Sequence, residues 1–200
     1  MYGKINKPFW DDKPVAVIGG GPSLIDFDFE KLRGAHVLAV KGAIFDIPWA
    51  DAGFGLDMLR FNEWRDKLAN VQSRIYWAMP EDQLAIAGQP PSRNITFLKR
   101  LDGHNLSDDP SVIYDGGSSG FGAVQICIHK RAKQIVLFGF DYYGNSPSNK
   151  WENWARHFSV FVPYLTKHGI QVVNACPASA IRCFQKVALQ DGIAICANGS

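Results

Sequence analysis

Three glycines and a serine follow the first apolar run of the sequence, in the order Gly19-Gly20-Gly21-Pro22-Ser23. Glycines let a backbone approach a ligand closely, and free N–H groups with a nearby hydroxyl suit phosphate. The loop lacks the GK[ST] ending of a Walker loop, and Leu24 stands where a dinucleotide fingerprint has its third glycine. We therefore predict phosphate or nucleotide contact at this loop, with a plain tight strand-to-helix turn as the alternative.

A second glycine- and serine-rich loop, Asp115-Gly116-Gly117-Ser118-Ser119-Gly120, precedes the best predicted helix of the chain. The first N–H groups of a helix have no partner inside the helix and favour anions. Ser118, Ser119 and Gly120 are therefore candidate nucleotide contacts. The alternative is that Ser118 or Ser119 simply caps the helix, and the two roles are compatible.

An acidic and aromatic pair, Asp141 and Tyr142, follows the apolar run Gln134–Phe140. That run reads as a buried strand, so Asp141 stands at the carboxyl edge of the predicted sheet. Its carboxylate is suited to a ribose hydroxyl, to a metal ion or to ordering the loop. An Asx-type turn is the alternative.

His157 belongs to an aromatic segment, 151–167, that reads as one helix. Trp154, Phe158 and Phe161 share its face by i, i+3 and i+4 spacing. A lone histidine on an apolar face is more often a core residue than a general base. Both readings stay open from the residues alone.

Strands alternating with helices must position these loops, which predicts a Rossmann-like α/β three-layer sandwich with a mainly parallel sheet. We expect one nucleotide-binding domain over 1–200, because 200 residues suit a single core. The segment 80–114 holds four prolines among polar residues and is expected to be an irregular insertion or lid. Predicted strands are 14–19, 35–40, 52–56, 74–78, 95–98, 134–140 and 170–174; predicted helices are 26–33, 58–68, 118–131, 151–167 and 178–187.

Composition narrows the class of protein. The net charge of +2 favours no nucleic-acid surface, and the cluster of His129, Lys130, Arg131 and Lys133 reads as a solvated helix end. The four cysteines include no CxxC pair, so no zinc or redox motif is implied. No signal core or membrane-length apolar run is evident, and we expect a reduced, cytoplasmic protein.

The motif order GGGPSL, then GGSSGFGAVQICIHKRAKQIVLFGFDYYG, then HGIQVVNACPASAIRCF resembles the sialyltransferase-like and DUF115 (MptE-like) superfamily. The look-alikes of this size are uncharacterised phage and prophage proteins. Bacterial members include sialyltransferases that use CMP-sialic acid, and an archaeal relative is a 6-hydroxymethylpterin diphosphokinase. The resemblance covers most of the chain outside 80–114, and it implies the superfamily rather than one reaction.

By position, the resemblance implies nucleotide contacts for Gly20, Gly21, Ser23 and the Ser119-Gly120 pair, and for Asp141 and Tyr142. Ser179, in a Cys-Pro-x-Ser turn, would complete the base-side pocket. His157 falls near the catalytic histidine that deprotonates the acceptor hydroxyl. Two positions depart from the sialyltransferases, which have asparagines where this chain has Lys41 and, nearby, Asp57. The full set of predicted nucleotide contacts is Gly19, Gly20, Gly21, Pro22, Ser23, Lys41, Asp57, Ser118, Ser119, Gly120, Asp141, Tyr142 and Ser179.

The leading hypothesis is a nucleotide-dependent transferase that moves a sugar from a nucleotide-sugar donor to a hydroxyl acceptor. The enzyme alternative is Mg²⁺-dependent pyrophosphoryl transfer to a pterin-like hydroxymethyl heterocycle, with Asp57 and Asp141 as metal ligands. A non-catalytic phage nucleotide-binding protein and a nucleic-acid-modifying enzyme are further alternatives. We expect no permanently bound cofactor, Mg²⁺ only together with substrate phosphates, a small-molecule donor, and a homo-oligomer.

Overall fold

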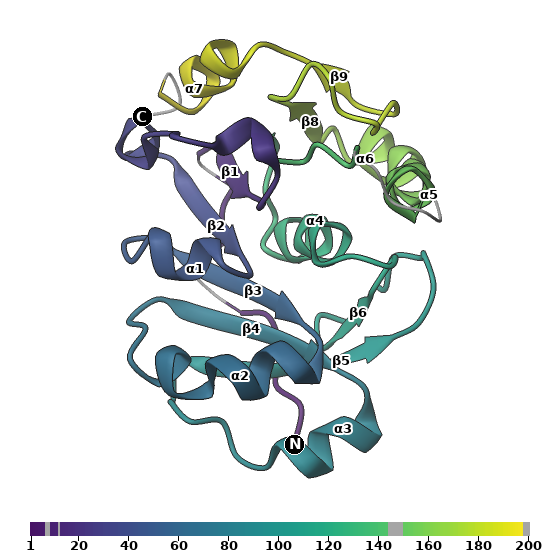
Figure 1. Cartoon of the computed structure of the whole chain (residues 1–200). Coiled ribbons are helices and arrows are strands. Elements are labelled where there is room, and N and C mark those ends of the chain that lie inside the picture. Colours follow the sequence, from purple (N-terminus) through teal and green to yellow (C-terminus); the bar gives the residue numbers. More distant parts are fainter. Residues whose placement is uncertain (7–8, 12, 144–149, 198–200) are drawn as a thin grey trace.

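A parallel sheet forms the centre of the protein (Figure 1). The computed structural model describes residues 1–6, 9–11, 13–143 and 150–197. Within these residues the sheet has nine strands in the order β6-β5-β4-β3-β2-β1-β7-β8-β9, and every pair is parallel. The strands are β1 (Val15–Ile18), β2 (His36–Val40), β3 (Ala52–Leu56), β4 (Arg74–Met79), β5 (Ile95–Leu101), β6 (Val112–Tyr114), β7 (Gln134–Phe138), β8 (Gln171–Asn174) and β9 (Gln185–Lys186).

Helices cover both faces of the sheet, which confirms the predicted three-layer α/β architecture. One face packs against the short α1 (Ala43–Asp46), α2 (Met58–Ala69), α3 (Glu81–Ala87) and α7 (Leu189–Ala197). The other packs against α4 (Ser119–His129), α5 (Lys150–His157) and α6 (Val162–Lys167). Three short 3-10 turns complete the set: η1 (Pro22–Leu24), η2 (Phe29–Leu32) and η3 (Phe158–Phe161).

Strand β1 shows why these apolar runs form a central sheet. Val15 and Val17 join the core under α4, whereas Ala16 and Ile18 join the core on the opposite face. All four side chains have no exposed surface. A parallel strand covered on both faces is expected to be apolar throughout rather than alternating, and this sequence has that pattern.

The strand order reverses direction at β1. From β1 the chain adds β2 to β6 on one side, and it then returns to place β7 on the other side of β1. The loops that follow β1 and β7 therefore lie side by side at the carboxyl edge of the sheet. This is the switch point at which open α/β sheets bind ligands.

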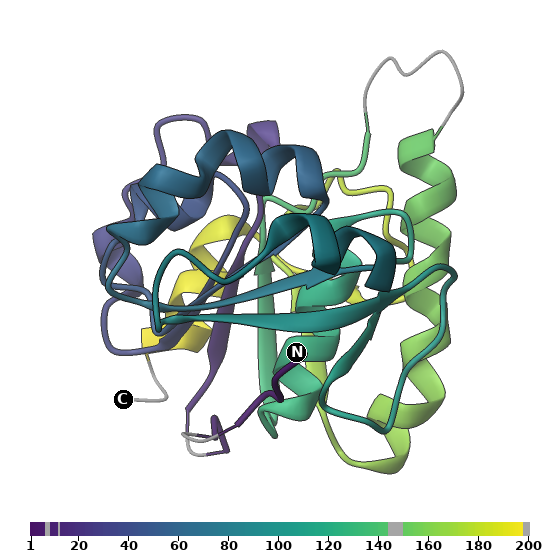
Figure 2. The same ribbon diagram turned by 90° about the horizontal axis from the view of Figure 1, so that it is seen from below.

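Three predicted segments need correction. The segment 80–114 is no irregular insertion, because it holds α3, β5 and β6 and extends the parallel sheet. Its prolines punctuate these elements; Pro80, for example, is the N-cap of α3. The segment 178–187 is not a helix: it holds β9, and the last helix is α7. The segment 151–167 is one helical column divided into α5, η3 and α6 (Figure 2).

Ser179 explains the missing helix over 178–187. Its hydroxyl donates to the carbonyl of Phe140 at 2.6 Å and accepts from the N–H of Ile181 at 3.1 Å. A serine side chain bonded to nearby backbone in this way competes with helical hydrogen bonding.

The prediction of a fully solvated cluster after α4 is wrong for Lys130. This lysine is 2% exposed, and its Nζ donates to the carbonyl of Asn6 at 2.8 Å. The amino group also lies over the rings of Trp10 and Tyr76, 5.0 and 5.7 Å from the centroids. Burial lowers the pKa of Lys130 to about 8 and also lowers the pKa of His129. Arg131 and Lys133 are exposed as expected.

All four cysteines lie in the described residues and are free thiols. In the part of the chain that the structure describes, no helix combines the length and apolarity that crossing a bilayer requires.

The buried lysine predicts a pH-dependent stability. The folded-state pKa of Lys130 is about 8, against 10.5 for an ordinary lysine, so between these values the unfolded chain binds more protons. We expect the free energy of unfolding to gain about 2 kcal/mol relative to Lys130→Met as pH rises from about 8 to about 10.5. Urea denaturation across this range measures the difference. Lys133→Met, an exposed lysine on the same segment, is the control, and an equal slope in wild type and Lys130→Met would contradict the prediction.

Candidate functional site

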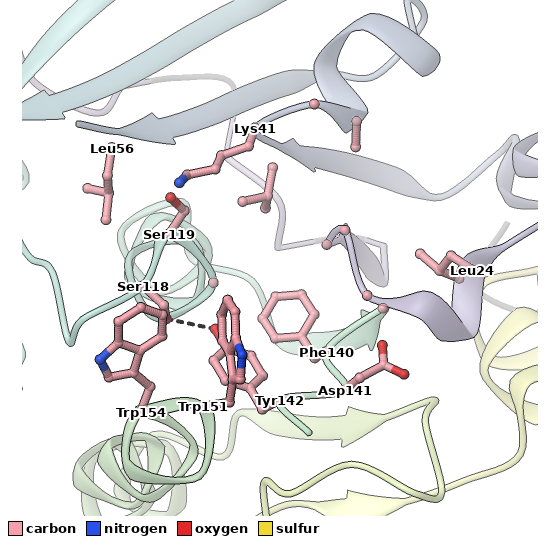
Figure 3. A pocket seen from close by; sticks show the side chains of 18 of the residues that line it. Leu24, Lys41, Leu56, Ser118, Ser119, Phe140, Asp141, Tyr142, Trp151 and Trp154 are labelled. Carbon is pink, nitrogen blue, oxygen red and sulfur yellow. Dashed lines mark hydrogen bonds between the residues drawn. The ribbon is translucent and has the colours of Figure 1, made fainter. Parts of the chain in front are cut away.

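A cavity of about 950 Å³ opens at the carboxyl edge of the sheet, at the switch point (Figure 3). It extends from Arg100 on β5 to Asp141 after β7, which is five strand spacings or about 24 Å. Most of the predicted nucleotide contacts line it: Gly19, Gly20, Gly21, Pro22, Lys41, Asp57, Ser118, Ser119, Gly120, Asp141 and Tyr142. Ser23, Ser179 and His157 do not.

Helix α4 points its N-terminus into this cavity. Ser118 is the N-cap, with an extended backbone, and its Oγ accepts from the N–H of Phe121 at 3.3 Å. The same hydroxyl is 2.7 Å from the hydroxyl of Tyr142. The N–H groups of Ser119 and Gly120 precede the first intrahelical bonds, so they carry the positive end of the helix dipole into the cavity. Ser118 is therefore the cap of α4, as one of the two interpretations predicts, and nucleotide contact by Ser118 and Ser119 stays a prediction.

Ser119 has an unused hydroxyl inside the cavity. The residue is 6% exposed, and its Oγ is buried without a hydrogen-bond partner among the described residues. The amino group of Lys41, on β2's end, and this hydroxyl point toward the same space (Figure 3). A buried polar group left unpaired costs about 1 to 3 kcal/mol. The Ser119 hydroxyl is therefore a candidate hydrogen-bond donor to a ligand in the cavity.

Arg100 is a second cation in the cavity and was missed in the sequence. Its Nε is also buried without a hydrogen bond in the described structure, 3.9 Å from the Asp115 carboxylate. Strand β5 continues to Leu101, three residues beyond the predicted end, which carries Arg100 to the carboxyl edge. Recognising the longer strand would have found it, since charged side chains there face a ligand site.

Lys41 and Asp57 stand opposite each other where β2 and β3 end. Their Nζ and Oδ2 atoms are 3.1 Å apart, and both side chains are more than one-third exposed. Each has a positive φ, 54° for Lys41 and 76° for Asp57, and Tyr142 after β7 has 52°. Such backbones cost on the order of 1 to 3 kcal/mol each and concentrate at functional sites. All three residues line the cavity.

Most N–H groups of the glycine loop, predicted to contact phosphate, donate hydrogen bonds within the protein instead. Gly19 donates to the carbonyl of Phe138 at 2.8 Å, Gly21 to that of Gly139 at 3.0 Å. The N–H of Ser23 donates to Asp141 Oδ1 at 3.2 Å. These donors tie the loop after β1 to the loop after β7. Gly20 is the loop glycine at which a Cβ would meet open space.

Asp141 is the centre of this tie. It is 2% exposed and accepts the N–H and the hydroxyl of Ser23, the latter at 2.8 Å, and the thiol of Cys176 at 3.3 Å. Burial and this carboxylate raise the pKa of Cys176, so the residue stays a thiol. The carboxylate also raises the pKa of the Tyr143 hydroxyl beside it. Of the roles predicted for Asp141, the geometry supports ordering the loop.

Ser23 and Ser179 thus lie outside the cavity lining and bond to residues that belong to it. Ser23 bonds Asp141, and Ser179 bonds the Phe140 carbonyl as described above. His157 also lies outside the lining, with its Nδ1 2.9 Å from the carbonyl oxygen of Gly116.

Two tryptophans of α5 form an aromatic wall of the cavity (Figure 3). Trp151 and Trp154 meet edge to face, with ring centroids 5.1 Å apart. Trp151 is 37% exposed, and Tyr143, also in the lining, is 44% exposed. Exposed aromatic rings inside a largely apolar cavity suit a planar base or the apolar face of a sugar.

Asp57 and Asp141, the two metal ligands of the pyrophosphokinase alternative, follow strands that are not neighbours. Strands β2 and β1 lie between β3 and β7, so the strands that carry the two residues are three spacings apart, about 14 Å. Figure 3 shows Asp141 and Asp57's partner Lys41 on opposite sides of the cavity. Among the described residues, no group of three or more His, Cys, Asp or Glu side chains is arranged for a metal ion.

Comparison with protein-family models, with curated proteins and with solved structures finds no match.

The two neighbouring glycines of the loop give a matched test of this geometry. A Cβ on Gly21 would collide with the Asp141 carboxylate and lie 2.6 Å from the Gly139 carbonyl, whereas a Cβ on Gly20 meets open space. We expect Gly21→Ala to destabilise the fold by about 2 to 4 kcal/mol and Gly20→Ala by less than about 1 kcal/mol. Chemical denaturation measures both. Equal destabilisation would show that the tie between the two loops is not needed.

Proposed function

We propose that the protein is a nucleotide-dependent transferase, and that it moves a sugar from a nucleotide-sugar donor to a hydroxyl acceptor. The observation that carries this proposal is the buried, unpaired Ser119 hydroxyl at the N-terminus of α4. Lys41 and Arg100 add two cationic side chains to the same cavity, Lys41 paired with Asp57 and Arg100 beside Asp115, and the first N–H groups of α4 add backbone donors. This combination suits the phosphates of a donor.

The size and walls of the cavity support a donor larger than a phosphate. About 950 Å³ is at the upper end of the range for small-molecule sites. Trp151, Trp154 and Tyr143 provide ring surfaces on one side, and Leu24, Ile25 and Phe29 provide apolar surface near the glycine loop. A nucleotide sugar needs both kinds of surface beside its phosphates. The resemblance to the sialyltransferase-like superfamily points to the same class of donor.

In the proposed reaction the acceptor oxygen attacks the anomeric carbon while the bond from that carbon to the donor phosphate breaks. Negative charge then grows on the leaving phosphate. Lys41, the Ser119 hydroxyl and the first N–H groups of α4 stabilise that charge without rearrangement. The acceptor's proton passes to a group that lines the cavity, for which Asp46, Asp57 and Asp115 offer carboxylates that are not buried.

Sugar transfer fits the carboxylates better than pyrophosphoryl transfer does. Mg²⁺ sites usually combine one or two carboxylates with substrate phosphates. Asp57 is already paired with Lys41, and Asp141 already accepts hydrogen bonds from Ser23 and Cys176. The strands that carry these two residues are also not neighbours, so the pair is poorly placed to hold one ion.

Ser119→Ala tests the proposal. Because the hydroxyl has no partner in the free protein, we expect its removal to leave the melting temperature unchanged or slightly raised. We expect the affinity for CMP, UDP or a nucleotide sugar to fall by about 5- to 30-fold, because a charge-assisted hydrogen bond to phosphate is lost. A thermal-shift screen of CMP, UDP, ADP, GDP, ATP and nucleotide sugars, each with and without Mg²⁺, identifies the ligand first.

Ser179→Ala is the matched control, because it removes a serine that is buried and bonded to the Phe140 carbonyl outside the cavity lining. It should lower the melting temperature and leave the affinity unchanged. Binding of ATP only in the presence of Mg²⁺ would favour the pyrophosphokinase, and tight binding without turnover would favour a binding protein. No shift with any compound at millimolar concentration would refute the nucleotide site.

A further inference from the structure

His157 faces the backbone that leads into α4. Its Nδ1 is 2.9 Å from the carbonyl oxygen of Gly116. A carbonyl oxygen only accepts, so Nδ1 carries the proton in this contact. This hydrogen bond orients the imidazole ring and also holds one peptide group of the loop 115–118.

The same residue is also held through the peptide group on its N-terminal side. The N–H of Gly116 donates to the carbonyl of Gly103, in the β5–β6 loop, at 2.8 Å. The next residue, His104, stacks its ring on His157 with centroids 4.4 Å apart and planes inclined by 12°. Gly116 is therefore clamped between the β5–β6 loop and α5, which meet through the two histidine rings.

This clamp lies directly before the donor groups of α4. Gly116 and Gly117 have φ values of 51° and 80°, so the chain makes a tight left-handed turn before the N-cap Ser118. Trp154, one turn before His157 on α5, packs on Gly117 so closely that a Cβ there would collide with its ring. Helix α5 thus fixes both glycines that set the direction of the first N–H groups of α4.

We propose that His157 is a positioning residue: through Gly116 it holds the start of α4 in the geometry that receives the donor phosphates. The inference rests on the proposed function of the same cavity. It differs from the role of general base, because His157 does not line the cavity and its observed contact is to the loop.

Two substitutions separate these roles. In His157→Asn the side-chain N–H₂ takes the place of the Nδ1 donor, whereas the imidazole base is lost; His157→Ala removes both. Two measurements on the intact protein follow: hydrogen exchange of residues 117–120 without ligand, and the affinity for inorganic pyrophosphate. His168→Ala is the matched control, because His168 Nδ1 also contacts a carbonyl, that of Tyr164 at 2.8 Å, on α6 and outside the cavity lining.

We expect faster exchange at 117–120 in His157→Ala, about a fivefold loss of pyrophosphate affinity, and restoration of both towards wild type in His157→Asn. His168→Ala should behave as wild type in both measurements. Unchanged exchange and affinity in His157→Ala would overturn the inference, as would a defect in His157→Asn equal to that in His157→Ala. If wild type itself binds neither pyrophosphate nor any nucleotide, the proposed function fails, while the exchange at 117–120 still decides the role of His157.

Discussion

The Asp141 carboxylate holds the site together. It joins the loop after β1 to the loop after β7 by accepting hydrogen bonds from Ser23 and Cys176. The close approach requires glycine at position 21 and brings the Gly139 carbonyl against the same loop. One loop follows β1 and the other follows β7, the strand on the side of β1 away from β2. The hydrogen bonds between these two loops hold one side of the cavity in place. The rest of the lining includes the start of α4, Lys41 after β2 and Arg100 on β5.

This arrangement divides the work between the two glycine-rich loops. The loop after β1 uses most of its donors within the protein and leaves Gly20 open. The loop before α4 differs in this respect. The Ser118 side chain caps the helix, whereas the buried hydroxyl of Ser119 makes no hydrogen bond to the described residues. The unpaired hydroxyl therefore belongs to the loop before α4, while Gly19 and Gly21 supply the clearance that close packing of the backbones requires.

Much of this could be predicted from the sequence. The buried strands are recognisable because burial on both faces leaves nearly continuous apolar runs, as in Val15–Ile18 and Gln134–Phe138. The residues directly after these runs could then be assigned to the carboxyl edge of the sheet. Arg100 was missed because β5 looks polar towards its end. Lys130 was read as solvated because its partners, Trp10 and Tyr76, are distant in sequence. The bonds of Ser179 and the contact of His157 with Gly116 depend on tertiary packing that no local pattern records.

The reversal of strand order also governs how the chain assembles. In the finished sheet β1 is central, with β2 on one side and β7 on the other. Its partner β7 begins at Gln134, more than a hundred residues further along the chain than Ile18. Until β7 is synthesised and docked, β1 is an edge strand with unpaired backbone groups, and apolar edges of this kind recruit other chains. The side of the cavity that carries Asp141 cannot form before β7 docks beside β1, and chains truncated before β7 are expected to aggregate through the exposed edge of β1.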